Sequence, residues 1–180
     1  MLYCFLAPGF EETEAIAPID MLRRAKIDVK TVGVGAKQIT GSHNIPFICD
    51  LTDDQIVLDA SLDGVILPGG MPGTLNLEKS AAVQKALDFC HENGKLLCAI
   101  CAAPSVLGHK GFLQGKTAIA FPGFEKDLLG AVISETPVAV DGNIITAKGA
   151  GVALDFGFAI VAALKDKQTA ADIRASIQCP

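Results

Sequence analysis

Short apolar runs alternate with helix-like stretches along almost the whole chain, and this alternation is what most restricts the fold. Runs typical of buried strands occur at residues 2–7, 29–34, 64–67 and 96–100. Most of them are apolar on consecutive residues, which is the pattern of strands covered on both faces. The sequence therefore predicts an α/β fold, in which a mostly parallel sheet carries helices on both faces.

Helical spacing of apolar residues fills the segments between these strands. Ser80 is a candidate N-cap, and the helix after it places Val83, Leu87 and Cys90 on one face and stops at Gly94. The other predicted helices are residues 14–25, 101–109, 152–164 and 169–177. Each helix is therefore expected to pack an apolar face against the sheet.

Two further strand signals complete the pattern. Residues 45–49 form a candidate strand near a sheet edge, because Pro46 interrupts the run and cannot donate to a ladder. Residues 141–143 read Asp-Gly-Asn between two apolar runs at 138–140 and 144–146. This arrangement predicts a β-hairpin.

Length and composition restrict the class of protein. The chain of 180 residues shows no linker or internal repeat, so we expect one domain covering residues 1–180. No apolar run reaches the length of a membrane span. The net charge of −5 and the lack of a basic stripe argue against a nucleic-acid partner.

The N-terminus and the cysteines indicate the compartment. The first seven residues lack the basic start and long apolar region of a signal peptide, so we expect them to form a strand. The six cysteines are expected to be reduced, because a domain of this size needs no disulfides. Both observations favour a cytoplasmic location.

The sequence around Cys101 has the pattern of a nucleophile elbow. Cys101 stands between the strand-like run at 96–100 and a helix-like stretch, where a sharp turn presents a side chain. The adjacent helix N-terminus is expected to favour the thiolate, the reactive form. Cys98 makes a Cys-x-x-Cys spacing, but its place inside the strand argues against a redox pair. No second ligand pair accompanies the two cysteines, so no metal site is expected here.

Two other loops are expected at the same edge of the sheet as Cys101. Residues 8–14 follow the first strand, and Glu14 precedes an apolar stretch that would turn it inward. Burial beside a thiolate would raise the pKa of Glu14, which could then donate a proton or relay one. Glu11 and Glu12 fit the simpler role of acids at a helix start.

The second loop, residues 68–73, is rich in glycine and proline. Its simplest interpretation is a plain turn. Missing side chains also let backbone N–H groups approach a reacting centre, so Gly70 and Ala102 are candidate donors to an oxyanion. The loop lacks the Gly-Lys-Ser/Thr of a phosphate loop.

Taken together, these elements resemble the DJ-one/ThiJ/PfpI superfamily along nearly the whole chain. The stretches that carry the resemblance are residues 9–14, 20–25, 67–70, 100–104 and 148–151. The resemblance implies a flavodoxin-like three-layer sandwich, a homodimer and chemistry without a metal or organic cofactor. By position it implies that Cys101 is the reactive cysteine, that Glu14 is its protonated partner, and that Gly70 and Ala102 are backbone donors.

Three positions bear on what this member of the superfamily does. The protease-like branch has a histidine directly after the cysteine, where this chain has Ala102. Some relatives carry a histidine near the position of Phe121. His43 falls near a position where relatives have a site arginine, although an exposed loop histidine is the simpler interpretation.

The leading hypothesis is a cysteine-dependent glyoxalase or protein deglycase, acting on methylglyoxal or its adducts. Cys101 and Glu14 are expected to be catalytic, and Gly69 and His43 to bind substrate, a small reactive aldehyde or a glycated side chain. An alternative is a non-catalytic redox sensor or stress chaperone. An amidase or peptidase is the third hypothesis, and it requires a histidine contributed by another segment or by the second subunit.

Overall fold

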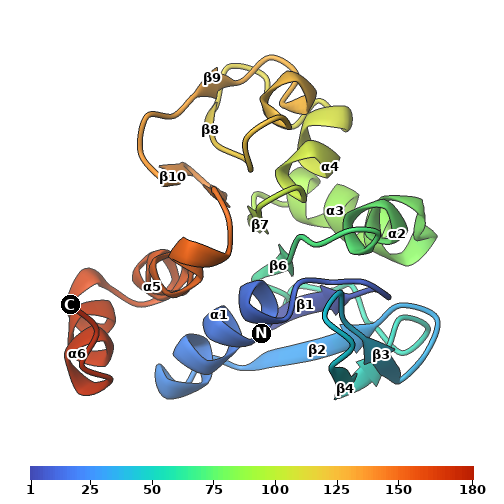
Figure 1. The fold of residues 1–180 in the computed structure, drawn as a ribbon, viewed down its shortest axis with the longest axis horizontal. Coiled ribbons are helices and arrows are strands. Elements are labelled where there is room, and N and C mark those ends of the chain that lie inside the picture. The colour runs from blue at the N-terminus through green and yellow to red at the C-terminus, as the bar shows by residue number, and fades with distance from the viewer.

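A seven-stranded sheet runs through the middle of the computed structural model, which describes residues 1–180 (Figure 1). Its strand order is β10-β11-β7-β6-β1-β2-β5, and every neighbouring pair is parallel except β10 with β11. The strands are β1 (Leu2–Leu6), β2 (Val29–Gly33), β5 (Leu51–Thr52), β6 (Gly64–Leu67), β7 (Leu96–Ile100), β10 (Val138–Asp141) and β11 (Ile144–Ala147). The predicted mostly parallel α/β fold is confirmed.

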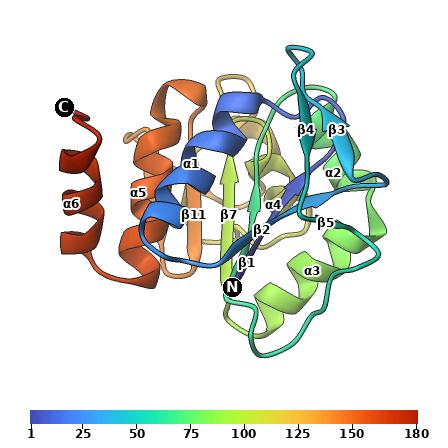
Figure 2. The same ribbon diagram turned by 90° about the horizontal axis from the view of Figure 1, so that it is seen from below.

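Helices cover both faces of this sheet, as Figures 1 and 2 show. One face carries α1 (Glu12–Arg24) and α5 (Ala153–Leu164), and α6 (Lys167–Ser176) packs on the outer side of α5. The other carries α2 (Gly73–Lys79), α3 (Ala81–Glu92) and α4 (Pro104–His109). Two short 3₁₀ turns, η1 (Glu125–Asp127) and η2 (Ala150–Val152), complete the helical elements. None of the helices combines the length and apolar character that a membrane crossing requires.

Alternating side chains of the central strand divide the core into two layers. Leu2, Cys4 and Leu6 of β1 pack with α1 and α5, whereas Tyr3 and Phe5 pack with the helices of the other face. All five side chains are at most 2% exposed. Each fully buried side chain of this size contributes roughly 1.5–3 kcal/mol relative to an exposed one.

Four short strands lie outside the main sheet. They are β3 (Gln38–Thr40), β4 (Pro46–Ile48), β8 (Thr117–Ala118) and β9 (Val132–Ile133). The strand predicted at 45–49 exists as β4, but it pairs with β3 in a separate two-stranded sheet. The edge strands of the main sheet are β5 and β10 instead. The hairpin predicted around residues 141–143 is confirmed by the antiparallel pairing of β10 and β11.

Helix boundaries follow local chemistry. Ser80 caps α3 as predicted, because its hydroxyl accepts from the N–H of Val83 at 3.4 Å. α1 begins two residues before the predicted start, with Glu11 as its N-cap. α4 begins at Pro104 rather than at Cys101, because Cys101 has a positive φ of 65° that no helix accommodates.

Candidate active site

Three loops meet at the carboxyl edge of β1, β6 and β7, as the sequence predicted. The loops after β1 and β6 are joined by backbone hydrogen bonds, from the Glu11 N–H to the Gly69 oxygen at 3.0 Å and from the Gly73 N–H to the Gly9 oxygen at 3.2 Å. Because β6 lies between β1 and β7, this junction is adjacent to the turn that follows β7. This is the edge where α/β folds place their ligands.

Cys101 occupies the turn after β7 in a strained backbone conformation. A φ of 65° is unusual for a residue with a side chain and costs about 1–3 kcal/mol. Two hydrogen bonds hold it: its N–H donates to the Ala147 oxygen at 2.9 Å, and its oxygen accepts from the Phe121 N–H at 2.8 Å. The turn therefore has the form of an elbow that presents a half-buried thiol.

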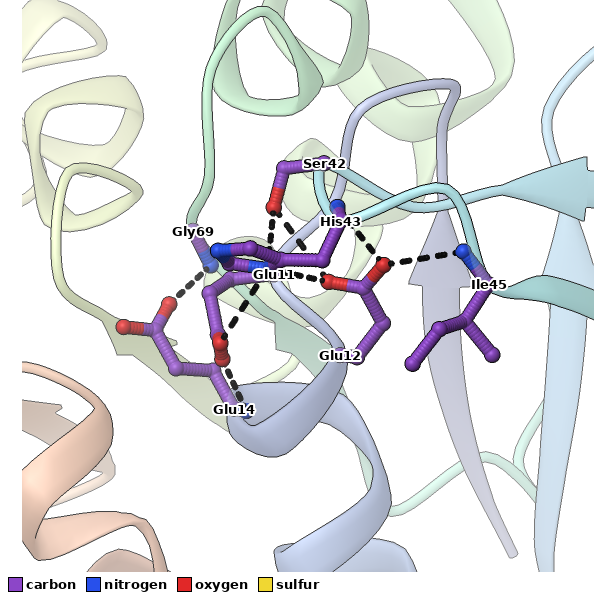
Figure 3. Close-up of polar contacts among 7 residues, drawn as sticks. All are labelled: Glu11, Glu12, Glu14, Ser42, His43, Ile45 and Gly69. Atoms are coloured by element: carbon purple, nitrogen blue, oxygen red, sulfur yellow. Dashed lines mark hydrogen bonds and ion pairs between the residues drawn. The ribbon is translucent and has the colours of Figure 1, made fainter.

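Glu14 points inward from the first turn of α1 and is 1% exposed. Its Oε2 accepts from the Gly69 N–H at 2.9 Å (Figure 3), and the carboxyl is also a hydrogen-bond partner of the Cys101 thiol. Burial raises the pKa of Glu14 to about 7, the nearby charge of Glu11 adds to the rise, and the hydrogen bonds from Cys101, Gly69 and Ala150 oppose it. The predicted direction of this shift is confirmed.

The thiol of Cys101 is less acidic than its place beside a helix predicts. Burial and then the neighbouring charge of Glu14 raise the pKa of Cys101 to about 12, against the opposing hydrogen bonds from the Ala102 and Gly70 N–H groups. The helix α4 is only six residues long and starts three residues later. This direction runs against the expected preference for the thiolate while Glu14 is ionised, because a thiolate beside a carboxylate would bring two negative charges together.

Gly69 and Gly70 leave the space that this arrangement needs. A Cβ on Gly69 would lie 2.6 Å from both the Cys101 Cβ and the Glu14 Oε2. Gly70 has a φ of 88°, and a Cβ there would lie 2.4 Å from the Glu11 nitrogen. A side chain at either position would push the loop away from the sulfur, so the backbone N–H donors depend on glycine.

Glu12 holds the loop that carries His43 onto the start of α1. Glu12 is 5% exposed, and its Oε1 accepts from the N–H groups of His43 at 2.8 Å and Ile45 at 3.4 Å. Its Oε2 lies 2.9 Å from the His43 Nδ1 and accepts from the Ser42 hydroxyl at 3.3 Å (Figure 3). Glu12 lies in the first turn of α1 as predicted, and it also has a second role that was not predicted, which is to bind this loop. No sequence signal links it to a partner 31 residues away.

The pKa values in this second cluster move toward the charged forms. Burial opposes ionisation of Glu12, but the ring and N–H of His43 outweigh it and lower the Glu12 pKa. The hydrogen bond and charge of Glu12 raise the pKa of His43, whose side chain is 68% exposed. Glu11, Glu12 and His43 bring one candidate metal-ligand atom each within 4.8 Å of one another, yet both Glu12 oxygens already have partners within the protein.

The two remaining histidines lie in other clusters. The His91 ring stacks on Phe112 with 3.9 Å between centroids. His109 pairs with Glu78 at 2.6 Å and lies 3.7 Å from Asp127. No histidine of this chain is paired with Cys101, which leaves the peptidase hypothesis without a base from the same subunit.

Two further residues lie at the site, although neither was predicted from the sequence to have a role there. The Ala150 N–H is a hydrogen-bond partner of Glu14, and Phe121 fixes the Cys101 backbone. Phe121 also lines a cavity of about 350 Å³ together with residues 148–152. Cys98 instead lies 1% exposed within β7, where burial raises its pKa above the usual range.

Comparison with known proteins agrees with this geometry. A family model described as the DJ-1/PfpI family matches residues 2–163. The chain belongs to the DJ-1/PfpI family. Protein dj-1beta of Drosophila melanogaster is 34% identical over 171 residues, which cover 93% of this chain and 91% of that protein. A Pyrococcus horikoshii protein named as a deglycase is 30% identical over 146 residues, 79% of this chain and 86% of that protein.

Solved structures of the same family share the fold. A DJ-1 superfamily protein from Salmonella typhimurium, solved as a cysteine-to-alanine mutant, superposes with a TM-score of 0.93 and 36% identity. The superposition covers 99% of this chain and 98% of that one. The predicted flavodoxin-like three-layer sandwich is thereby confirmed.

Proposed function

We propose that this DJ-1/PfpI protein is a cofactor-independent enzyme in which Cys101 attacks small 2-oxoaldehydes, as a glyoxalase or as a deglycase of methylglyoxal adducts. The observation that carries the proposal is that the buried Glu14 carboxyl and the Cys101 side chain both lie against Gly69, at a strained elbow. The relative named as a deglycase supports the same class of activity.

The reaction begins when Glu14 takes the proton of the Cys101 thiol. The thiolate then attacks the aldehyde carbon, and Glu14 returns the proton to the resulting alkoxide, which gives a hemithioacetal and leaves Glu14 ionised. Glu14 moves a proton from this carbon to the neighbouring carbonyl carbon through an enediol, which converts the adduct into a thioester without any oxidant. Water hydrolyses the thioester, releasing the 2-hydroxy acid and restoring the thiol. Methylglyoxal gives lactate by this route.

Backbone groups complete the proposed site. The N–H groups of Gly70 and Ala102 lower the pKa of the Cys101 thiol, which supports them as donors to an oxyanion on the carbon that bonds to the sulfur. Gly69 keeps Glu14 in place through its N–H. His43 is proposed to bind substrate from the rim of the site, as a partly charged imidazole.

Turnover of methylglyoxal without glutathione tests the enzyme proposal. Purified protein is expected to produce lactate, and Cys101→Ala is expected to reduce the rate to background. Cys98→Ala is the matched control, since it removes a buried thiol from β7, the strand that leads into the Cys101 turn. Equal rates for the wild type and Cys101→Ala would remove the proposal.

A redox sensor or stress chaperone is a second candidate for the same thiol. Cys101 is half-buried beside two N–H donors that suit sulfinate oxygens, whereas Cys4, Cys49, Cys90 and Cys98 are buried. Mild peroxide is expected to add two oxygens, measured by intact mass, in the wild type and in Cys179→Ser. The addition is expected to vanish in Cys101→Ser. An unmodified wild type would contradict this role.

We also propose that two copies pair through the start of α1 and the β3–β4 hairpin. Ile16 on α1 is 43% exposed, and Ile45 and Ile48 on the hairpin are 53% and 71% exposed. Glu12 binds the hairpin loop to α1, so these side chains belong to one region. Ile48→Asp is expected to convert a dimer into a monomer in light scattering.

The unpaired state of all six cysteines supports a reducing compartment such as the cytoplasm.

A further inference from the structure

The cavity lined by Phe121, called here the Phe121 cavity, has no part in the bond-making steps of the proposed reaction. Its wall consists of Phe121, Pro122, Val152 and the backbone of residues 149–151, with the exposed Lys148 as its one charged side chain. Its volume of about 350 Å³ lies within the usual range of small-molecule sites, roughly 300–1,000 Å³.

The Phe121 cavity adjoins Glu14 on the side away from Gly69. A Cβ on Gly149 would lie 3.9 Å from the Glu14 Oε1 and 3.2 Å from the Phe121 Cδ2. The other carboxyl oxygen, Oε2, is the one that accepts from Gly69. The backbone of Gly149 therefore lies between the carboxyl of Glu14 and the Phe121 ring, with no side chain of its own.

The proposed chemistry directs part of the substrate toward this space. Cys101 holds the aldehyde carbon, and Glu14 must reach both that carbon and its neighbour to move the proton. The substituent on the neighbouring carbon then extends past Glu14. We infer that this substituent enters the Phe121 cavity, and that an aromatic or long alkyl group is preferred there over the methyl group of methylglyoxal. This inference rests on the proposed function.

The exposure of the Phe121 ring supports an apolar occupant. The ring is 48% exposed although its backbone N–H is fixed to Cys101, so a ligand can cover it without moving the loop. Covering apolar surface is favourable, and one additional aromatic pair contributes a factor of about 2–12 in binding. A histidine at this position would replace that apolar wall with a polar ring.

The test compares phenylglyoxal with methylglyoxal as substrates of the same protein. The ratio of the kcat/KM value for phenylglyoxal to that for methylglyoxal is expected to fall by a factor of about 2–12 in Phe121→Ala, because only the phenyl group loses an aromatic partner. Gly149→Ala is expected to raise the KM for phenylglyoxal alone, because its φ of 164° is open to any residue and the added methyl group enters the cavity. Leu129→Ala, an exposed residue outside the cavity, is expected to leave the ratio unchanged.

The outcomes separate this inference from the function on which it rests. Cys101-dependent turnover of both substrates, with the same ratio in the wild type, Phe121→Ala and Gly149→Ala, would overturn the inference and leave the enzyme proposal standing. Absence of Cys101-dependent turnover of either substrate would overturn both. Thermal unfolding of each variant checks that a changed ratio reflects the site rather than a loss of folded protein.

Discussion

Glu12 and Glu14 lie two residues apart in the first turn of α1, yet the fold moves their pKa values in opposite directions. Glu14 is buried against the Cys101 thiol near the charge of Glu11, so its pKa rises to about 7. Glu12 is nearly as buried, but it receives N–H donors and faces the imidazole of His43, so its pKa falls. The balance between burial and hydrogen-bond donors therefore decides whether a buried carboxyl holds a proton near neutral pH: burial outweighs the donors at Glu14, and the donors outweigh burial at Glu12.

The largest expected effect is on catalysis by Glu14. Glu14→Gln cannot accept the thiol proton, so kcat is expected to fall by about 10²–10⁴-fold in a glyoxalase assay. The wild-type rate is expected to rise as pH increases through about 7, because Glu14 must be ionised to act as a base. This rise is the acidic limb of the pH–rate profile, and it is expected to disappear in Glu14→Gln.

Two other acids of α1 serve as comparisons in the same assay. Asp20→Asn changes an exposed carboxyl that pairs with Arg24, and it is expected to keep both the rate and the limb near pH 7. Glu12→Gln is expected to keep the limb while raising KM. A wild-type profile that is flat between pH 5 and 9 would contradict the role of Glu14.

The difference between the two glutamates also limits what could be predicted from the sequence. The strand β7 and the elbow after it follow from local apolar pattern, and the structure places them as predicted. The inward orientation of Glu14 was predicted too, although its neighbour Ile16 is 43% exposed rather than part of the same buried face. Glu14 instead shares its face with Pro18 and Met21, at helical spacing.

The features missed in the sequence depend on contacts between distant segments. Glu12 binds a loop 31 residues later, largely through backbone N–H groups that any residue type would supply. The raised pKa of Cys101 depends on how deeply the thiol is buried and on the charge of Glu14, which the short helix α4 does not offset. Local sequence pattern therefore indicated the candidate reacting groups and the raised pKa of Glu14, but neither the lowered pKa of Glu12 nor the raised pKa of Cys101.

A smaller effect concerns stability, and here the two glutamates are expected to act with opposite signs. Glu14 binds its proton more tightly in the folded state, so its contribution to stability falls as pH rises from about 4.5 to 7. Glu14→Gln is therefore expected to be more stable than the wild type above pH 7, by on the order of 1–3 kcal/mol. Urea unfolding at several pH values measures this difference.

The contribution of Glu12 to stability is expected to depend on pH in the opposite direction, in the same unfolding measurement. Its lowered pKa contributes stability above pH 4.5 that is lost as pH falls through its folded value. The raised pKa of His43 adds stability below pH 6.5 that is lost as pH rises through its folded value. Glu12→Gln is therefore expected to be destabilised most between these two pH values. Parallel curves for the Glu12 and Glu14 variants would contradict the opposite shifts.

The smallest expected effect tests whether the exposed end of the Glu12 cluster takes part in function. His43→Gln keeps a hydrogen-bonding group but loses the titratable charge at the rim. Because the His43 side chain is 68% exposed, we expect a rise in KM of about threefold or less, with kcat unchanged, since weak binding is lost equally from substrate and transition state. The rise is expected to shrink at high salt, as for any solvent-exposed charge. A fall in kcat instead would mean that the Glu12–His43 pair supports the reacting groups themselves. The two glutamates would then differ in their contacts and pKa values, but both would contribute to catalysis.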